Sequence, residues 1–292
     1  MRALAAPVLA VCGLIASACG GADPNGAAAG QAAPATSASR QETRPQQQES
    51  QPQQQESQPQ QDSAKQEQPP EAEPLDGKVI VIDPGHNGGN YRRPDIINRQ
   101  VDVLTEKKAC DTTGTSTNDG YSEAAFTWDV STRLARILRS RGATVKLTRS
   151  GNTGVGPCIT QRAAIGNKAK ADAAISIHAD GAGPKDHGFH IIMPKKIGGP
   201  VDKVVGSSGK LGLAVRDAYR KGTGVPYSTY IGRDALDYRS DLGGLNLSTV
   251  PKVFIETGNM RNAGDAAKLR SPAFRQKAAV ALADGLQHYL GA

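Results

Sequence analysis

Four apolar runs of strand length, separated by stretches with helical periodicity, constrain the fold of this 292-residue chain more than any other feature. The runs lie at 79–83, 144–148, 173–178 and 252–256, and residues 188–193 form a fifth candidate strand. They show little polar alternation, which is typical of parallel strands that are buried on both faces. We therefore predict one α/β domain with a mostly parallel, twisted sheet flanked by helices on both faces.

The clearest helix is predicted at about 122–140. Phe126, Val130 and Leu134 recur every four residues on one face, and Ile137 or Leu138 continues this stripe. Gly142 follows the last turn and is expected to end the helix. Further helices are predicted at 159–170, 210–221 and 273–290.

The first quarter of the chain cannot build a hydrophobic core. Residues 20–75 are rich in Gln, Pro and Glu, repeat the motif QQESQPQ, and contain no large apolar residue before Leu75. Such a stretch buries too little apolar surface to offset the entropy lost on ordering. We expect a disordered linker at 20–75 and a folded domain at 76–292.

An apolar run directly after Met1-Arg2 predicts export. Residues 3–18 are too few for a comfortable membrane span but suit the core of a signal peptide, which we place at 1–19. Small residues precede Cys19 and two glycines follow it, so Cys19 is a candidate lipidation site. Ala16 stands where such sites usually carry Leu, and ordinary cleavage nearby is the alternative. We expect a location in the cell envelope, periplasmic or anchored to the membrane through this lipid alone, or secretion.

The net charge of the folded part indicates which class of molecule the protein binds. Residues 75–292 hold 31 Lys and Arg against 20 Asp and Glu, a net charge of +11. A basic exported domain meets anionic wall polymers rather than nucleic acid. Only 4% of the chain is aromatic, and we find no recognition-helix pattern, so nucleic acid is excluded as a partner.

Polar residues follow three of the predicted strands at the point where each strand ends. His86 comes shortly after the first strand, His178 ends the third, and Glu256 ends the last. Ligands of open α/β sheets gather beyond the carboxyl ends of the strands, so these side chains are expected to meet there. Two imidazoles and a carboxylate are a metal site in outline.

A catalytic zinc takes three protein ligands and a water, so the site needs one more ligand or a base. Glu123 is the candidate, because it lies three residues before Phe126 at the end of the buried stripe. The alternative is a first-turn carboxylate favoured by the helix dipole, and the residues alone favour that alternative.

The order of motifs from about residue 78 to 290 resembles the zinc-dependent N-acetylmuramoyl-L-alanine amidase family (amidase type 3), and most closely its small actinobacterial members with a disulfide. The motifs that carry the resemblance are Ile82-Asp83-Pro84-Gly85-His86, Ser122-Glu123, Leu147-Thr148-Arg149, Arg162 with Asn167, Ser176-Ile177-His178-Ala179-Asp180, and Phe254-Ile255-Glu256-Thr257-Gly258-Asn259-Met260.

The resemblance implies one Zn²⁺ ion bound by His86, Glu123 and His178, with Glu256 as the catalytic carboxylate. Glu106, in Thr105-Glu106-Lys107, is a rival for the first Glu of the family pattern. No apolar helical repeat follows it, so we prefer Glu123.

Two cysteines, Cys110 and Cys158, remain in the folded part. An even pair in an exported domain is more often a disulfide than a metal site. The resemblance to the disulfide-containing members implies that these two cysteines pair with each other.

The activity implied by the resemblance is hydrolysis of the amide bond between N-acetylmuramic acid and the L-alanine of the peptidoglycan stem peptide. Zinc would activate a water molecule, and Glu256 would move its proton. A zinc peptidase acting on the stem peptides and a non-catalytic wall-binding module are the alternatives. We expect a monomer that acts on peptidoglycan or its muropeptide fragments.

Other polar residues receive plainer interpretations. Asp83 and Asp180 are candidates to orient the ligating imidazoles. Arg149 and Arg162 are expected to anchor loops. None of the remaining histidines is assigned to the metal: His190 is interpreted as a packed or edge residue, His288 as a helix-end cation, and His187 as a loop residue. The segments 202–209 and 225–244 are Gly-rich and polar, and are candidates to shape the substrate groove.

Overall fold

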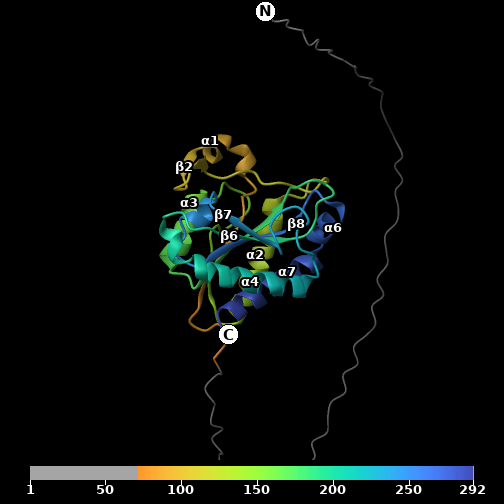
Figure 1. The fold of residues 1–292 in the computed structure, drawn as a ribbon. Helices are drawn as coiled ribbons and strands as arrows, with labels where there is room; N and C mark the ends of the chain where they lie inside the picture. The colour runs from red at the N-terminus through yellow and green to blue at the C-terminus, as the bar shows by residue number, and fades with distance from the viewer. Residues whose placement is uncertain (1–71, 292) are drawn as a thin grey trace, which may run out of the picture. The chain divides into compact units, whose positions relative to one another are not determined.

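A six-stranded mixed sheet forms the centre of the computed structural model, which describes residues 72–291 (Figure 1). Its strands stand in the order β4-β1-β5-β8-β6-β7. The first four are parallel to one another, β6 runs antiparallel to β8, and β7 is parallel to β6. The bounds are β1 Val79–Pro84, β4 Thr144–Leu147, β5 Ala173–Asp180, β6 His190–Pro194, β7 Leu236–Arg239 and β8 Lys252–Asn259. The predicted, mostly parallel sheet is therefore confirmed.

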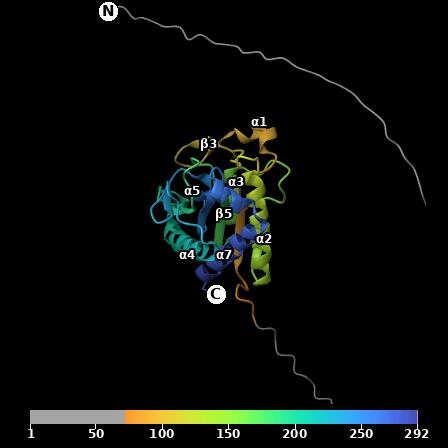
Figure 2. The same ribbon diagram turned by 90° about the vertical axis from the view of Figure 1, so that its right-hand side faces the viewer.

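Helices cover both faces of this sheet (Figure 2). One face is covered by α2 (Glu123–Ser140), α4 (Val205–Thr223) and α7 (Pro272–Tyr289), with α7 packed against both of the others. The other face carries α3 (Ile159–Ala169) and the short α5 (Gly243–Asn246). The remaining elements are the 3₁₀ turns η1 (Asn90–Arg92) and η2 (Pro200–Lys203), α1 (Pro94–Ile97), α6 (Ala263–Arg270), and a hairpin of β2 (Gln100–Asp102) and β3 (Lys107–Ala109).

The larger core lies between the sheet and α2, α4 and α7. The predicted stripe of α2 is buried there, with Phe126, Val130 and Leu134 fully inaccessible beside Ile80 and Ile82 of β1. Ser122 caps the helix, because its side chain accepts a hydrogen bond from the backbone N–H of Ala125. Burial of this stripe fixes the rotation of α2 and thereby directs its first residue, Glu123, toward the carboxyl end of the sheet.

The opposite face of the sheet becomes polar toward its carboxyl end. Val81 and Ala174 pack under α3, but the next residues on the same face are Asp83 and Ser176. Both are buried and hydrogen-bonded to each other. Beyond Ser176 the strand β5 presents His178, beside Glu256 of β8. The strand alternation thus places the candidate site at the carboxyl ends of β1, β5 and β8.

Several elements differ from the sequence prediction. β7, α6 and the β2–β3 hairpin were not predicted, and β7 lies inside the Gly-rich, polar segment 225–244, for which no strand was predicted. The segment 202–209 is mostly helical, because α4 begins at Val205 and buries Leu211 and Val215 against the sheet and α7. β7, α6 and the two strands of the hairpin carry too few residues for a clear period, so tertiary packing decides their structure.

The folded domain begins earlier in the sequence than predicted. Leu75, the last residue of the predicted linker, is fully buried, and its backbone N–H donates to the carbonyl of Arg141. The signal peptide at 1–19, Cys19 and the rest of the linker lie outside the described residues. Within residues 72–291, no helix is both long and apolar enough to cross a membrane.

Candidate metal centre and active site

Three side chains from distant parts of the sequence converge beyond the sheet. His86 follows β1, Glu123 opens α2, and His178 lies near the end of β5. One ligand atom from each lies within 4.8 Å of the other two. The Glu123 carboxylate bridges the imidazoles, with Oε2 3.2 Å from Nε2 of His86 and Oε1 2.9 Å from Nδ1 of His178. The sequence prediction named these three residues, and the structure brings them together.

Two glycines allow this close approach. A Cβ atom on Gly85 would overlap the His178 imidazole. A Cβ atom on Gly114, whose φ is +73°, would lie 2.7 Å from the His86 ring and 2.8 Å from Oε2 of Glu123. His86 itself has a φ of +57°, a left-handed conformation that is unusual for a residue with a side chain. The backbone is therefore shaped around the imidazoles and the carboxylate.

The rival carboxylate does not reach this cluster. Glu106 lies in the β2–β3 hairpin, where its side chain is 49% exposed and 3.9 Å from the Lys108 ammonium. The structure therefore brings Glu123, and not Glu106, to the two imidazoles.

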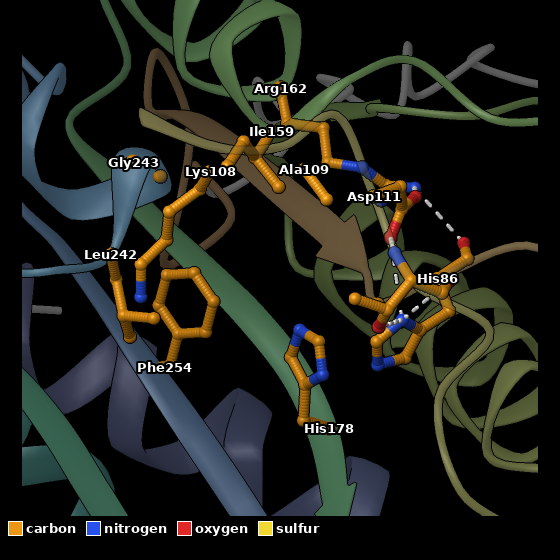
Figure 3. A pocket seen from close by; sticks show the side chains of 13 residues that line it. His86, Lys108, Ala109, Asp111, Ile159, Arg162, His178, Leu242, Gly243 and Phe254 are labelled. Carbon is orange, nitrogen blue, oxygen red and sulfur yellow. Dashed lines mark hydrogen bonds and ion pairs between the residues drawn. The ribbon is translucent and has the colours of Figure 1, made fainter. Parts of the chain in front are cut away.

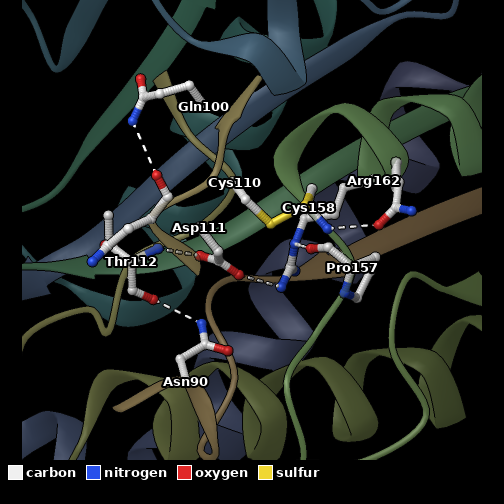
Figure 4. The surroundings of a disulfide bond; sticks show 10 residues. Asn90, Gln100, Cys110, Asp111, Thr112, Pro157, Cys158 and Arg162 are labelled. Carbon is white, nitrogen blue, oxygen red and sulfur yellow. Dashed lines mark hydrogen bonds and ion pairs between the residues drawn. A yellow bond between two sulfur atoms is a disulfide. The ribbon is translucent and has the colours of Figure 1, made fainter. Parts of the chain in front are cut away.

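His86 is held by groups that the sequence did not reveal. Its Nδ1 lies 3.4 Å from Oδ1 of Asp111 and 3.2 Å from the carbonyl oxygen of Thr112. Asp111 is buried, and its other carboxylate oxygen accepts a 3.0 Å hydrogen bond from Arg162 (Figure 4). Arg162 also donates to the carbonyl oxygen of His86. A carboxylate that accepts from one imidazole nitrogen orients the other nitrogen toward a metal.

The disulfide lies directly beside these groups. Cys110 and Cys158 are bonded to each other, as the resemblance implied (Figure 4). Cys110 precedes Asp111, and Cys158 is the residue at which α3, the helix that carries Arg162, begins. The disulfide therefore links the segment that carries Asp111 to the start of the helix that carries Arg162.

The expected roles of Asp83 and Asp180 need correction, because within residues 72–291 neither carboxylate forms a hydrogen bond to an imidazole. Asp83 is buried beneath the site, where it accepts from Ser176 and pairs with Arg162 and Lys252 at 2.8 and 3.2 Å. Asp180 accepts a 2.9 Å hydrogen bond from the Tyr230 hydroxyl. Asp83 therefore balances two buried cations, and Asp180 fixes a neighbouring loop.

Glu256 stands next to the cluster. It is the register partner of His178 on the adjacent parallel strand and lines the same pocket, of about 290 Å³, as His86, Glu123 and His178. Its Oε2 atom is buried, and within residues 72–291 it has no hydrogen-bond partner. An unpaired acceptor beside such a cluster suits a water molecule held on a metal.

The charges of the site reinforce this arrangement. Burial raises the pKa of Glu256 well above its ordinary value, and the nearby negative charge of Glu123 raises it further. Burial disfavours the charged form of His86, but the Glu123 and Asp111 carboxylates together more than offset this and raise the pKa of His86 to about 10. Burial likewise opposes ionisation of Glu123, yet His86 and His178 hold its pKa well below the usual range. Glu123 therefore stays ionised and favours a cation at the imidazoles, while Glu256 can carry a proton.

The donor set fits a divalent metal ion. Two imidazole nitrogens and one carboxylate oxygen are the ligands of many catalytic zinc sites, and such sites leave a position for water. His86, Glu123 and His178 could therefore hold a metal ion, and the unpaired oxygen of Glu256 would be available to accept a hydrogen bond from a water molecule.

The remaining polar residues keep the plainer interpretations. Arg149 donates to the carbonyl oxygens of Pro84 and Gly85, so it anchors the loop that carries His86, as Arg162 does. His190 is buried in β6 and is no part of the His86–Glu123–His178 group. His288 lies in the last turn of α7, and His187 lies in the loop before β6.

A second pocket, of about 300 Å³, adjoins the cluster on the side of α3 and α5 (Figure 3). His86 and His178 form one side of it, and Phe254 and Leu242 lie opposite. The sequence analysis did not identify Phe254, Leu242 or Lys108 as residues that line a pocket. Two of them are apolar and one is a partly exposed lysine, and such residues are common in a sequence whether or not a pocket is nearby.

Comparison with known proteins gives consistent matches across the folded part. Residues 80–288 match the family model described as N-acetylmuramoyl-L-alanine amidase. The chain is 39% identical over 216 residues to an N-acetylmuramoyl-L-alanine amidase of Mycobacterium tuberculosis, a match that covers 73% of this chain and 87% of that protein.

Solved structures give the same result. The chain is similar to the N-acetylmuramyl-L-alanine amidase Ami1 of Mycobacterium smegmatis, with 38% identity and a TM-score of 0.70 over 74% of this chain and 98% of the other. Ami1 of Mycobacterium abscessus matches with 41% identity and a TM-score of 0.70, over 74% of this chain and all of the other.

Proposed function

The chain belongs to the N-acetylmuramoyl-L-alanine amidase family, and from this premise we propose that it is a zinc-dependent peptidoglycan hydrolase. It cleaves the amide bond that joins the lactyl group of N-acetylmuramic acid to the L-alanine of the stem peptide. The observation that carries the proposal is the convergence of His86, Glu123 and His178 beside the unpaired oxygen of Glu256.

His86, Glu123 and His178 would hold the zinc ion. When bound, zinc supplies a Lewis acid and lowers the pKa of a coordinated water to roughly 7, which makes hydroxide available at neutral pH. Asp111 accepts from His86 and keeps its other nitrogen directed at the site. Gly85 and Gly114 leave the space in which the three ligands meet.

Glu256 moves the proton. Its free oxygen accepts a proton from the attacking water as the water oxygen bonds to the lactyl carbonyl carbon. The carbon–nitrogen bond then breaks, and Glu256 returns the proton to the departing amine of L-alanine. A raised pKa suits this role, because the carboxyl group must hold the proton between the two steps.

The products distinguish this activity from the alternatives. We expect purified peptidoglycan digested by the zinc-loaded protein to release intact stem peptides that begin with L-alanine, detected by mass spectrometry. Shortened stems that are still attached to sugar would identify a peptidase instead. Binding to peptidoglycan without release of either fragment would identify a wall-binding module.

We also propose that the protein works in the cell envelope as a monomer. The apolar run after Met1-Arg2 would direct export, Cys19 would carry a lipid, and the Gln/Pro-rich stretch would tether the domain. Fractionation of cells that express the full chain checks this. Membrane association that disappears in a Cys19→Ser variant supports lipidation, whereas equal membrane association of both proteins contradicts it.

A further inference from the structure

We propose that His190 is a positioning residue that holds the Glu256 carboxylate through an internal water molecule shared with Asp237. This role rests on the proposed function, in which the Glu256 carboxylate moves the proton. His190 itself lies outside the His86–Glu123–His178 group.

His190 and Glu256 lie opposite each other on neighbouring strands. They are register partners in the antiparallel pair of β6 and β8, so their side chains project from the same face of the sheet. Directly opposed residues of such a pair have Cβ atoms roughly 4.5–5.5 Å apart. Glu256 is also the register partner of His178 on its other side. The order across this face is therefore His178, Glu256 and His190, and His190 lies on the side of Glu256 that is away from His178.

Asp237 joins this row from β7. It is the register partner of Ile192 in β6, and Ile192 lies two residues after His190, so all three side chains project from one face. The charge of the Asp237 carboxylate acts on the His190 imidazole, as expected for neighbouring groups. Three polar side chains from adjacent strands thus lie side by side next to the metal cluster.

One atom of each of these side chains is buried without a partner. Among the residues that the structure describes, Nδ1 of His190, Oδ2 of Asp237 and Oε2 of Glu256 form no hydrogen bond. Buried polar atoms of native proteins almost always have a partner, and where the protein offers none, an internal water commonly supplies it. Three such atoms on adjacent strands indicate one water that they share.

The other polar groups nearby are engaged elsewhere. Arg239 donates from Nε and Nη2 to the two carboxylate oxygens of Asp241, at 2.7 and 2.6 Å. Oδ2 of Asp180 accepts from the Tyr230 hydroxyl at 2.9 Å. The Tyr230 ring lies edge-on to the His190 imidazole, with ring centroids 6.0 Å apart. These contacts fix the surroundings of His190 but leave its Nδ1 atom to the water.

The hydrogen-bonding capacities of the three groups match one water. Burial lowers the pKa of His190 more than the nearby carboxylates raise it, so the imidazole is neutral and carries one proton. In their ionised forms, Asp237 and Glu256 can only accept. A water that donates to each carboxylate and accepts from Nδ1–H of His190 forms the three hydrogen bonds typical of a buried water. Each carboxylate oxygen has two lone pairs, so Oε2 of Glu256 can still accept from the attacking water.

Loss of the imidazole donor should slow the chemical step. For His190→Leu in the full-length, zinc-loaded protein, we expect kcat on a soluble N-acetylmuramoyl peptide to fall about 100-fold, as for a reacting group displaced by about 1 Å. KM and zinc content should not change. His190→Asn keeps a donor near the position of Nδ1 and should recover most of kcat. Ile191→Val alters the same strand on its opposite face, within the larger core, and should leave kcat unchanged.

A crystal structure of the unaltered, zinc-loaded protein that shows ordered waters tests the site without any variant. We expect one density peak within about 3.2 Å of Nδ1 of His190, Oδ2 of Asp237 and Oε2 of Glu256. No peak at this place, or a Glu256 carboxylate turned away from His190, would overturn the proposal.

The kinetic results can overturn it separately. A normal kcat in His190→Leu, or a loss of kcat that His190→Asn does not recover, would show that His190 does not position Glu256. In both cases the unaltered protein still cleaves its substrate, so the proposed function stands. If the unaltered protein holds the water but cleaves neither the muramoyl peptide nor whole peptidoglycan, the proposed function fails, and the role of His190 fails with it.

Discussion

Removal of the Cys110–Cys158 bridge should cost the domain a large part of its stability. The bridge joins residues 48 apart in sequence, and the closed loop contains α2 and β4. In the chain-entropy model, a loop of this length stabilises the folded state by about 4 kcal/mol, because the open unfolded chain has more conformations to lose. For a domain of this size, the corresponding fall in Tm is roughly 8 to 16 °C.

The assay compares thermal unfolding of the unaltered protein with that of a Cys110→Ala/Cys158→Ala variant. Alanine is chosen because Cys110 is fully buried and a hydroxyl there would add a separate cost. A chelator is present in both samples, so that differences in metal binding do not contribute to Tm. A reduction in Tm of less than about 3 °C would refute the view that the bridge limits the unfolded chain.

The other predictions concern the site and the buried charges. Glu256→Gln should lower kcat by about 10²–10⁴-fold with zinc content unchanged, because only proton transfer is removed; metal analysis and product assays check both. Asp111→Asn should weaken zinc binding about 10- to 100-fold by releasing His86, measured by chelator competition; unchanged affinity would contradict its positioning role. Gly85→Ala should abolish zinc binding in a folded protein, because its Cβ would occupy the space of the facing imidazole. Burial opposes ionisation of Asp83, but two cations hold its pKa well below the ordinary value, so its contribution to stability is full above about pH 5, begins to fall near pH 4, where the unfolded carboxyl takes up a proton, and is lost as pH falls on toward the lower pKa of the folded state. Urea unfolding at pH 6 and pH 3 should show this loss in the unaltered protein and a smaller one in Asp83→Asn.

The sequence predicted those parts of the fold and site that depend on local periodicity. His178 and Glu256 could be found because each ends an apolar run, and parallel strands end at one edge. The buried stripe of α2 placed Glu123 at the start of that helix, but the residues alone favoured a helix-dipole role, and its assignment as a ligand came from the family resemblance. The disulfide followed from two cysteines and a family resemblance.

Contacts between distant segments could not be read in this way. Asp111 lies in a loop without any period, and only the folded chain brings it to His86. Asp83 was expected to orient one of the ligating imidazoles. Its partners Arg162 and Lys252 are 79 and 169 residues away, and no local pattern indicates that they meet beneath the sheet.

Crystals of the zinc-loaded protein, measured at the zinc absorption edge, test the central claim most directly. We predict one strong anomalous peak within bonding distance of His86, Glu123 and His178, with Glu256 hydrogen-bonded to a water on that ion. A peak elsewhere in the domain, or zinc bound without these three side chains, would contradict the account.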